Sequence, residues 1–334
     1  MRRGAFSRFI NGLQAPALQA ILSNRVTIIY ISVFAFMLAA AAVVPSVLTP
    51  ANILSTFRQA GILGVVALGQ FFVIMGGAWR KDVGVDLSVG MTLFLITIAF
   101  GHINKVVHSD IITTFLCLLL GATIGLINGI MIVKGNISPF IATMATSLVA
   151  QGIAWIMSIT MGMTAPPYLV FLGSGKIGFI PMAFICFIIL AIILWLISRY
   201  STFGIRIYAK SSNPKALQLL GVNLGLYTVI TYVISGLLSA FAGLLYLGFL
   251  VHPSMRYVDV FTFDSIAAVI LGGTEFVGGI GSILGIIPAA IFMRFLYNFV
   301  LAFKVPEATR RIMQGVIIIA VIAVYVIQSR RLRR

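Results

Sequence analysis

Long apolar runs separated by short polar segments fill most of the sequence. Because an α-helix needs about 20 mostly apolar residues to cross a bilayer, these runs predict membrane-spanning helices. The runs 111–133 and 184–197 are apolar on every side, whereas strands of a membrane β-barrel alternate apolar and polar positions. The pattern therefore predicts an all-α, polytopic membrane protein. We place about ten spans, at about 26–45, 55–76, 87–101, 111–133, 139–161, 180–198, 226–250, 262–276, 281–303 and 311–328.

Two of these runs, 87–101 and 262–276, are shorter than a bilayer requires. A half-helix or re-entrant segment is tolerated at membrane depth where protein or a water-filled cavity covers its backbone. We therefore expect one or two short or re-entrant helices. The chain around Gly76-Gly77 and the chain around Gly272-Gly273 share a faint pattern of apolar run, glycine pair and glycine-rich restart, which leaves an internal duplication open.

Composition supports a membrane location. Hydrophobic residues make up 60% of the 334 residues, charged residues make up 9%, and the mean hydropathy is +1.12; soluble domains carry about 25% charged residues. The net charge of +16 does not indicate a nucleic-acid partner, because the basic residues lie in short clusters between apolar runs. Cys117 and Cys186 lie inside apolar runs and are interpreted as buried hydrophobic residues.

Basic residues also predict the orientation. The ten predicted crossings place both termini on the same side, and cytoplasmic loops carry an excess of Lys and Arg. With the N-terminus inside, most of the 23 basic residues fall in cytoplasmic segments. We therefore predict cytoplasmic N- and C-termini, a cytoplasmic N-terminal segment at 1–25 and a cytoplasmic loop at 199–225.

The polar segment 199–227 carries a helix signal. Its first part is basic and is interpreted as strand-like. Asn213 and Pro214 then open a short helix over Lys215–Leu220, which Gly221 ends; asparagine before a helix, proline at its first position and glycine after its last are typical of helix boundaries. The helix is too short to span a membrane. It is either a solvated surface helix or a helix that docks into a partner.

Sequence motifs for catalysis are absent. No GxxxxGK[ST], HExxH, CxxC or GxSxG occurs, so we expect no Walker-type ATP site, no metal, no cofactor and no enzymatic activity. His102, His108 and His252 are placed in outer loops without the spacing of metal ligands. Arg294 lies well inside a predicted span, where we expect a helix C-terminal carbonyl to be its partner.

The glycine-rich stretch 272–285, GGTEFVGGIGSILG, allows two interpretations. As a phosphate cradle it is a poor match, because no helix-opening GKS follows. As a packing device it is suitable, because small residues let helix backbones approach closely and let a short helix reverse inside the protein. We favour packing, which gives Gly272, Gly273, Gly278 and Gly279 structural roles.

Four pieces of the sequence carry a family resemblance. VDLSVG at Val85–Gly90 includes Asp86, Ser88 and Gly90, and it is followed by NISPFIATMAT at Asn136–Thr146, by the loop Phe203–Asn223, and by Phe263–Gly285, which includes Asp264. In this order they resemble the permease subunits of ribose/xylose/galactose-type bacterial ABC importers. The resemblance runs from about Asn52 to the last span, which is most of the chain.

This resemblance implies a single permease domain over 1–334 in the bacterial inner membrane. It would move a sugar into the cytoplasm, powered by a separate cytoplasmic ABC ATPase and supplied by an extracytoplasmic sugar-binding protein. Membrane lipid and a second permease copy, identical or paralogous, are the other implied partners. The short helix becomes the one that docks into the ATPase, through Asn213, Pro214, Lys215, Ala216, Leu217, Leu220 and Gly221.

Candidate residues for the translocation path are polar side chains in or beside the spans: Asn128, Asn136, Ser138, Thr143 and Asn298. The alternative for each is an ordinary hydrogen bond between helices, worth about 0.6 kcal/mol on average in membrane bundles, and we favour it for most of them. Asp86 is expected to cap the third span, where the helix dipole favours an anion.

The sequence departs from the family pattern after Gly76-Gly77, where Trp79–Val83 is inserted, and at Ser211-Ser212 and Glu275. Two other functions remain open. One is a nucleoside ABC importer permease, and the other is an ion-coupled secondary transporter, which the scarcity of acidic residues inside spans disfavours. The solute itself cannot be identified from this sequence.

Overall fold

The computed structural model describes residues 25–78, 82–158, 165–250 and 259–303 except 277, with isolated positions between 305 and 316. These residues are almost entirely helical. Their elements are α3 (Arg25–Val43), the 3-10 helix η1 (Pro45–Leu48), α4 (Pro50–Gly76), α5 (Val89–Val107), α6 (Asp110–Val133), α7 (Pro139–Ser158), α8 (Pro167–Ser174), the antiparallel strands β1 (Lys176–Ile177) and β2 (Ile180–Pro181), α9 (Met182–Tyr200), α10 (Thr202–Ser212), α11 (Pro214–Leu219), α12 (Leu224–Leu250), α13 (Asp259–Leu271) and α14 (Ile283–Leu301).

Seven helices of the described chain are long and apolar enough to cross a membrane, namely α4, α5, α6, α7, α9, α12 and α14. The all-α, polytopic fold is therefore confirmed. Helices α3 and α13 occupy the predicted spans 26–45 and 262–276, and α13 has only 13 residues. Helix α5 has 19 residues and ends at Val107, later than predicted. The predicted span 311–328 and segment 1–25 lie largely outside the described residues.

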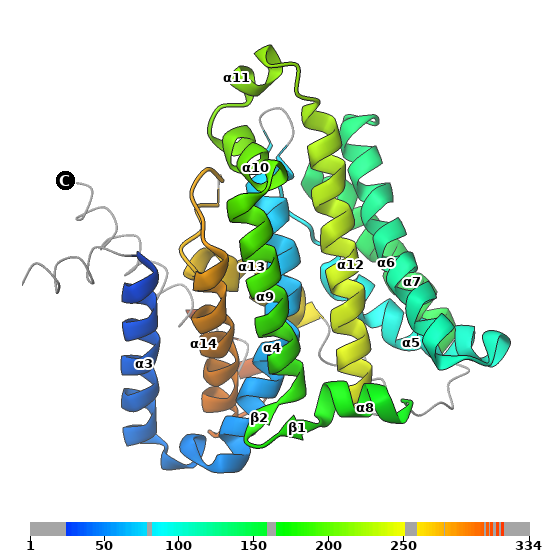
Figure 1. Ribbon diagram of the computed structural model, residues 1–334. Coiled ribbons are helices and arrows are strands. Elements are labelled where there is room, and N and C mark those ends of the chain that lie inside the picture. Colours follow the sequence, from blue (N-terminus) through cyan, green and yellow to red (C-terminus); the bar gives the residue numbers. More distant parts are fainter. Residues whose placement is uncertain are drawn as a thin grey trace, which may run out of the picture.

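The helices form a bundle with two distinct ends (Figure 1). Helices α10 and α11 lie at one end, which we call the α11 end. Element η1, helix α8 and the β1–β2 hairpin lie at the opposite end, which we call the hairpin end. Both ends are joined by the long helices α4, α9 and α12.

Helix α4 is the centre of the bundle. Its residues from Ala60 to Gly76 are all buried, and its Phe71 and Phe72 belong to the main hydrophobic core with side chains of α9, α12, α13 and α14. A helix that is apolar on all sides is expected to be surrounded by protein. Helices α6, α7 and α9 instead expose many large apolar side chains, a surface suited to lipid or to another membrane-embedded chain.

Glycines bring α6 and α12 into close contact. A Cβ added at Gly121 would overlap the backbone of Gly236, and one added at Gly125 would overlap the carbonyl of Tyr232. Glycines four residues apart form one face of a helix, which lets two membrane helices pack backbone to backbone. The α13–α14 turn uses the same device, because Gly272 and Gly285 pack against each other. This is the packing role predicted for the glycine-rich stretch.

Two local predictions are wrong. The segment predicted to be strand-like is helix α10, whose residues Gly204, Ile207 and Lys210 recur every third position and are buried. The hydroxyl of Ser201 caps it by accepting from the Gly204 amide at 3.2 Å. Burial of this helical face and the cap outweigh the strand preference of its β-branched and aromatic residues. His102, predicted to lie in a loop, is in the last turns of α5.

Candidate functional site

An irregular segment, residues 82–88, leads into α5, and its residues from Gly84 to Ser88 are buried. The amide of Leu87 donates to Thr143 Oγ1 of α7 at 3.1 Å, and Tyr232 of α12 donates to the carbonyl of Val85 at 3.2 Å. With its oxygen and nitrogen assigned to suit their partners, the Gln70 amide of α4 pairs with both backbone groups of Asp86, at 3.1 and 3.2 Å. Side chains of three helices thus satisfy backbone groups that have no helical partner.

The Asp86 carboxylate is the polar centre of this segment, and its residue is 1% exposed. One oxygen accepts from the amide and the hydroxyl of Ser88, at 2.9 and 2.6 Å. The other accepts from the hydroxyl of Ser235 at 2.7 Å. Asn128 donates to the Ser88 hydroxyl at 2.9 Å. We call residues 82–88 with these partners the Asp86 junction.

Asp86 does not cap α5 as predicted. The residue at the cap position is Ser88, whose side chain makes no capping bond. Asp86 lies two residues earlier and binds Ser88 itself, because the turn before α5 points its carboxylate toward α12. At the first turn of α5, the amide of Gly90 donates to Thr262 Oγ1 of α13 at 3.2 Å, which ties α5 to α13.

The predicted path residues fall in different places. Asn128 and Thr143 are buried in the Asp86 junction. Asn298 of α14 donates to Thr56 of α4 at 2.7 Å. Asn136 is exposed in the α6–α7 turn with a positive φ of 53°, and Ser138 is half-buried beside it. Asn298 therefore makes the interhelical bond offered as the alternative, whereas Asn128 and Thr143 bond to the irregular segment before α5. A role in the path remains a prediction for all five.

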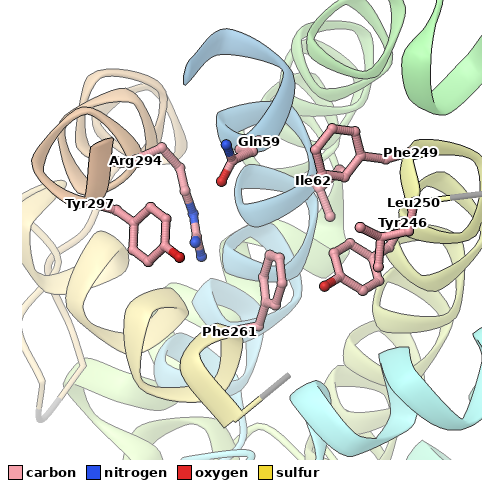
Figure 2. Close-up of a pocket in the computed structure, with 8 residues that line it drawn as sticks. All are labelled: Gln59, Ile62, Tyr246, Phe249, Leu250, Phe261, Arg294 and Tyr297. Atoms are coloured by element: carbon pink, nitrogen blue, oxygen red, sulfur yellow. The ribbon is translucent and has the colours of Figure 1, made fainter. Parts of the chain in front are cut away.

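A cavity of about 150 Å³ lies between α4, α12, α13 and α14 (Figure 2). It is near the hairpin end, since its residue Phe249 packs against Arg58, which donates to the Ser174 carbonyl of α8 at 2.7 Å. None of its lining residues was predicted to lie in the translocation path. They are Gln59, Ile62, Tyr246, Phe249, Leu250, Phe261, Arg294 and Tyr297.

Arg294 and Asp264 form a buried ion pair beside this cavity. Arg294 Nη2 and Asp264 Oδ2 are 3.0 Å apart, and the two side chains are 4% and 7% exposed. The guanidinium also lies over the ring of Phe261, 4.6 Å from its centre. The partner of Arg294 is thus a carboxylate of α13, and the predicted helix carbonyl is wrong. Within the described chain, Arg294 Nε has no hydrogen-bond acceptor.

The α11 end has the local structure that the sequence predicted. Asn213 Oδ1 accepts from the amide of Ala216 at 3.1 Å, Pro214 is the first residue of α11, and Gly221 follows with a φ of 73°. Leu217 is buried, whereas Leu219 and Leu220 are 90% and 77% exposed. Leu219 was missed by the sequence analysis, because a six-residue helix is too short for its two faces to be told apart.

Helix α10 connects α11 to the bundle. The ammonium group of Lys210 donates to the carbonyl of Gly76 at the end of α4 and to the hydroxyl of Thr228 in α12. Burial lowers the pKa of Lys210 to about 7. Tyr208 donates to the carbonyl of Gly281 at 3.0 Å, and Gly278 packs against Ser211. One short helix thus contacts α4, α12 and the α13–α14 turn.

Gly273, Gly278 and Gly279 shape that turn. Their φ values are 89°, 85° and 88°, in the region that only glycine adopts without strain. Among the residues described, no group of three or more His, Cys, Asp or Glu side chains is placed to hold a metal ion.

Known proteins similar to this chain are transport permeases. Residues 52–322 match the family model described as branched-chain amino acid transport system / permease component. The ribose import permease protein of Bacillus subtilis (strain 168) is 32% identical over 294 residues, which cover 87% of this chain and 89% of that protein.

Two further relatives come from Escherichia coli (strain K12). The galactose/methyl galactoside import permease protein is 28% identical over 303 residues, covering 84% of this chain and 87% of that protein. The galactofuranose transporter permease protein is 28% identical over 290 residues, covering 85% of this chain and 80% of that protein. The comparison with solved structures finds no match.

Proposed function

The chain belongs to the family of permease components of the branched-chain amino acid transport system type, and from that premise we propose that it is the membrane-spanning subunit of an ATP-driven importer for a sugar. The similarity to the ribose import permease protein carries this proposal, because it extends over 87% of this chain and 89% of that protein. The other relatives described above are also named for sugars. Their agreement favours a sugar over an amino acid as the solute.

The partners follow from this role. We propose that a cytoplasmic ABC ATPase docks at the α11 end, a sugar-binding protein delivers the solute at the hairpin end, and a second permease copy completes the path. The exposed Leu219 and Leu220 support the first of these, since exposed apolar side chains on a capped, rigid helix suit insertion into a cleft of a partner. ATP hydrolysis then takes place on the partner chain.

Helix α10 supplies a route for mechanical coupling. Displacement of α11 by an ATPase would move α10, whose Lys210 contacts the end of α4 and the start of α12. Tyr208 on the same helix would move the α13–α14 turn. Helices α12, α13 and α14 line the cavity with α4, so a rigid-body motion at the α11 end reaches it, as alternating access requires.

The proposal is tested by reconstitution. The chain is co-expressed with the ATPase and the solute-binding protein encoded beside it, purified in mild detergent and placed in liposomes. ATP-dependent uptake is then measured with radiolabelled D-ribose, D-galactose, leucine and adenosine, with and without the binding protein. We expect the ATPase to co-purify and one of the sugars to enter only when ATP and the binding protein are both present.

Three results would contradict this function. Uptake of leucine without any sugar would favour an amino-acid permease, and uptake of adenosine alone would favour the nucleoside importer. Solute movement without ATP, by a chain that purifies alone, would identify an ion-coupled transporter. Omitting ATP and replacing it with a non-hydrolysable analogue are the matched controls.

A further inference from the structure

We propose that the cavity between α4, α12, α13 and α14 binds one monosaccharide during transport, and that Arg294 donates hydrogen bonds to its hydroxyl groups. This inference rests on the proposed function and assigns the solute a place inside the permease. It is carried by three features: the buried guanidinium, the surrounding rings and the position of the cavity in the bundle.

The guanidinium of Arg294 has hydrogen-bonding capacity left over. Arg294 is 4% exposed and lines the cavity, and in the described structure neither its Nε nor its Nη2 makes a hydrogen bond of good geometry. Buried donors are nearly always satisfied by protein or by ordered water. Figure 2 shows the side chain extending between Gln59, Phe261 and Tyr297. A solute in the cavity would supply the missing acceptors.

The ion pair with Asp264 indicates which solute fits. The carboxylate 3.0 Å away already balances the charge of the guanidinium, so the cavity has little attraction left for an anion. A solute carboxylate would compete with Asp264 for the same positive group. Neutral hydroxyls can accept from the remaining N–H groups of the planar guanidinium without displacing Asp264. A neutral sugar therefore fits better than an amino acid.

Aromatic rings line the rest of the cavity. Phe249 and Phe261 offer apolar ring surfaces, and Tyr246 and Tyr297 each combine a ring with a hydroxyl group. A monosaccharide likewise presents C–H groups on its faces and hydroxyls at its edges. Binding sites for small molecules are typically apolar and aromatic, with a few polar groups that set orientation. Stacking on rings and donation from Arg294 match these two kinds of sugar surface.

The position of the cavity suits a transport intermediate. It lies at the hairpin end, where the proposed binding protein would deliver the solute, and its wall includes α13, which is bonded to the start of α5 through Gly90 and Thr262. An occupant would contact all four helices at once. It would thereby bridge the helices that the α11 end is proposed to move.

Cysteine protection tests this site directly. Gln59, half-buried in the wall, is changed to cysteine in a chain carrying Cys117→Ala and Cys186→Ala, the two native cysteines. The complete transporter is reacted with a small methanethiosulfonate reagent, with and without D-ribose or D-galactose. At a sugar concentration about ten times that giving half-maximal protection, we expect labelling of Gln59→Cys to slow about tenfold.

Phe179→Cys is the matched control, because Phe179 lies in the hairpin turn at the same end and is 96% exposed. Its labelling should be unaffected by sugar. Arg294→Lys in the Gln59→Cys chain keeps a positive charge for Asp264 but removes the planar donor group. We expect the sugar concentration for half-protection to rise about tenfold, the effect of losing a hydrogen bond to a charged donor.

Three results would contradict either this inference or the proposed function. If the transporter takes up a sugar but labelling of Gln59→Cys is absent, or is unchanged by that sugar, the cavity is not its binding site and the proposed function stands. If Arg294→Lys lowers thermal stability but leaves half-protection unchanged, Arg294 is purely structural and this inference is overturned. If no sugar is taken up by the unmodified transporter, the proposed function itself fails.

Discussion

At the scale of single residues, the irregular chain before α5 depends on side chains far away in the sequence. The Asp86 carboxylate accepts three hydrogen bonds, from two groups of Ser88 and from Ser235. A carboxylate inside a membrane protein is costly unless it is paired or hydrogen-bonded. These bonds offset that cost, and they hold α5 against α12 in one position.

Lys210 is a second buried polar residue with a connecting role. Its ammonium group contacts the last carbonyl of α4, where the helix dipole favours a cation. Burial opposes this and lowers the pKa of Lys210 to about 7. The ammonium group of Lys210, which joins α10 to α4, therefore loses its proton near neutral pH.

This predicts a pH-dependent stability. Lys210 has a pKa of about 7 in the folded protein and about 10.4 when unfolded, so between these values the unfolded chain binds more protons. The free energy of unfolding should then rise with pH across that window, by at most about 1.4 kcal/mol per pH unit. The measurement is the thermal unfolding midpoint of the detergent-solubilised protein from pH 7 to pH 9.

Lys210→Met provides the comparison, because it fills similar space without titrating. Its midpoint should rise less with pH than that of the unchanged protein. If the unfolding midpoint rises equally with pH in the two proteins, Lys210 stays charged throughout this range. Burial would then not lower its pKa to near neutral pH.

At the scale of elements, α11 has one buried side and one exposed side. Leu217 is buried, whereas Leu219 is 90% exposed. We predict that Leu219→Asp weakens association with the ATPase about tenfold or more, since it places a charge in the proposed cleft. The measurement is the amount of ATPase that co-purifies, with the midpoint of thermal unfolding of the permease as a check on folding.

Leu217→Asp is the informative contrast. It places a charge among buried side chains, so it should lower the unfolding midpoint, whereas Leu219→Asp should not. Full co-purification and normal uptake with Leu219→Asp would remove α11 from the docking site. The sequence-based set of docking residues includes Leu217 and omits Leu219, and this pair of variants tests that set.

Sequence patterns predicted the spans well and the irregular elements less well. The apolar runs predicted the place of every helix in the described chain that is long enough to cross a membrane, because the requirement for about 20 apolar residues is a property of one segment. Helix α5 was predicted to be shorter than it is. The α11 boundaries were predictable for the same reason, since Asn213, Pro214 and Gly221 act locally. Helix α10 was not, because its burial depends on α4 and α12.

The candidate site was harder to predict than the fold. Arg294 was recognised as unusual, but its partner Asp264 lies on another helix 30 positions earlier, and no pattern within either segment indicates the pair. The cavity residues are mostly ordinary apolar and aromatic side chains. They become a site only where α4, α12, α13 and α14 meet. Asn128 and Thr143 were recognised as polar residues in spans, whereas their bonds to the Asp86 junction required the structure.

At the scale of the whole molecule, the bundle has two chemically different ends. The α11 end carries Arg206, Lys210 and Lys215, and the hairpin end carries Lys176 beside the apolar turn of Ile177 and Phe179. The positive-inside rule assigns the first of these ends to the cytoplasm. The orientation is a prediction, and it places the cavity nearer the outer face.

We predict that a membrane-impermeant thiol reagent applied to the outside of intact cells, with any outer membrane made permeable, labels Phe179→Cys but not Leu219→Cys. Both residues are at least nine-tenths exposed, at 96% and 90%, so the difference would report their side of the membrane. When the permease is expressed without its ATPase, disruption of the membrane should expose Leu219→Cys as well. Labelling of Leu219→Cys alone in intact cells would reverse the orientation and remove α11 as a site for a cytoplasmic ATPase.

The Asp86 junction also has a consequence for how the chain is made. Residues 82–88 leave the ribosome long before Tyr232 and Ser235, which satisfy their polar groups in the finished bundle. Until α12 has been synthesised, this segment has no stable place in the hydrocarbon layer. Biogenesis should therefore be delayed at this point: α5 waits at the surface or in the translocon, and nascent chains stopped before α12 become substrates for quality-control proteases.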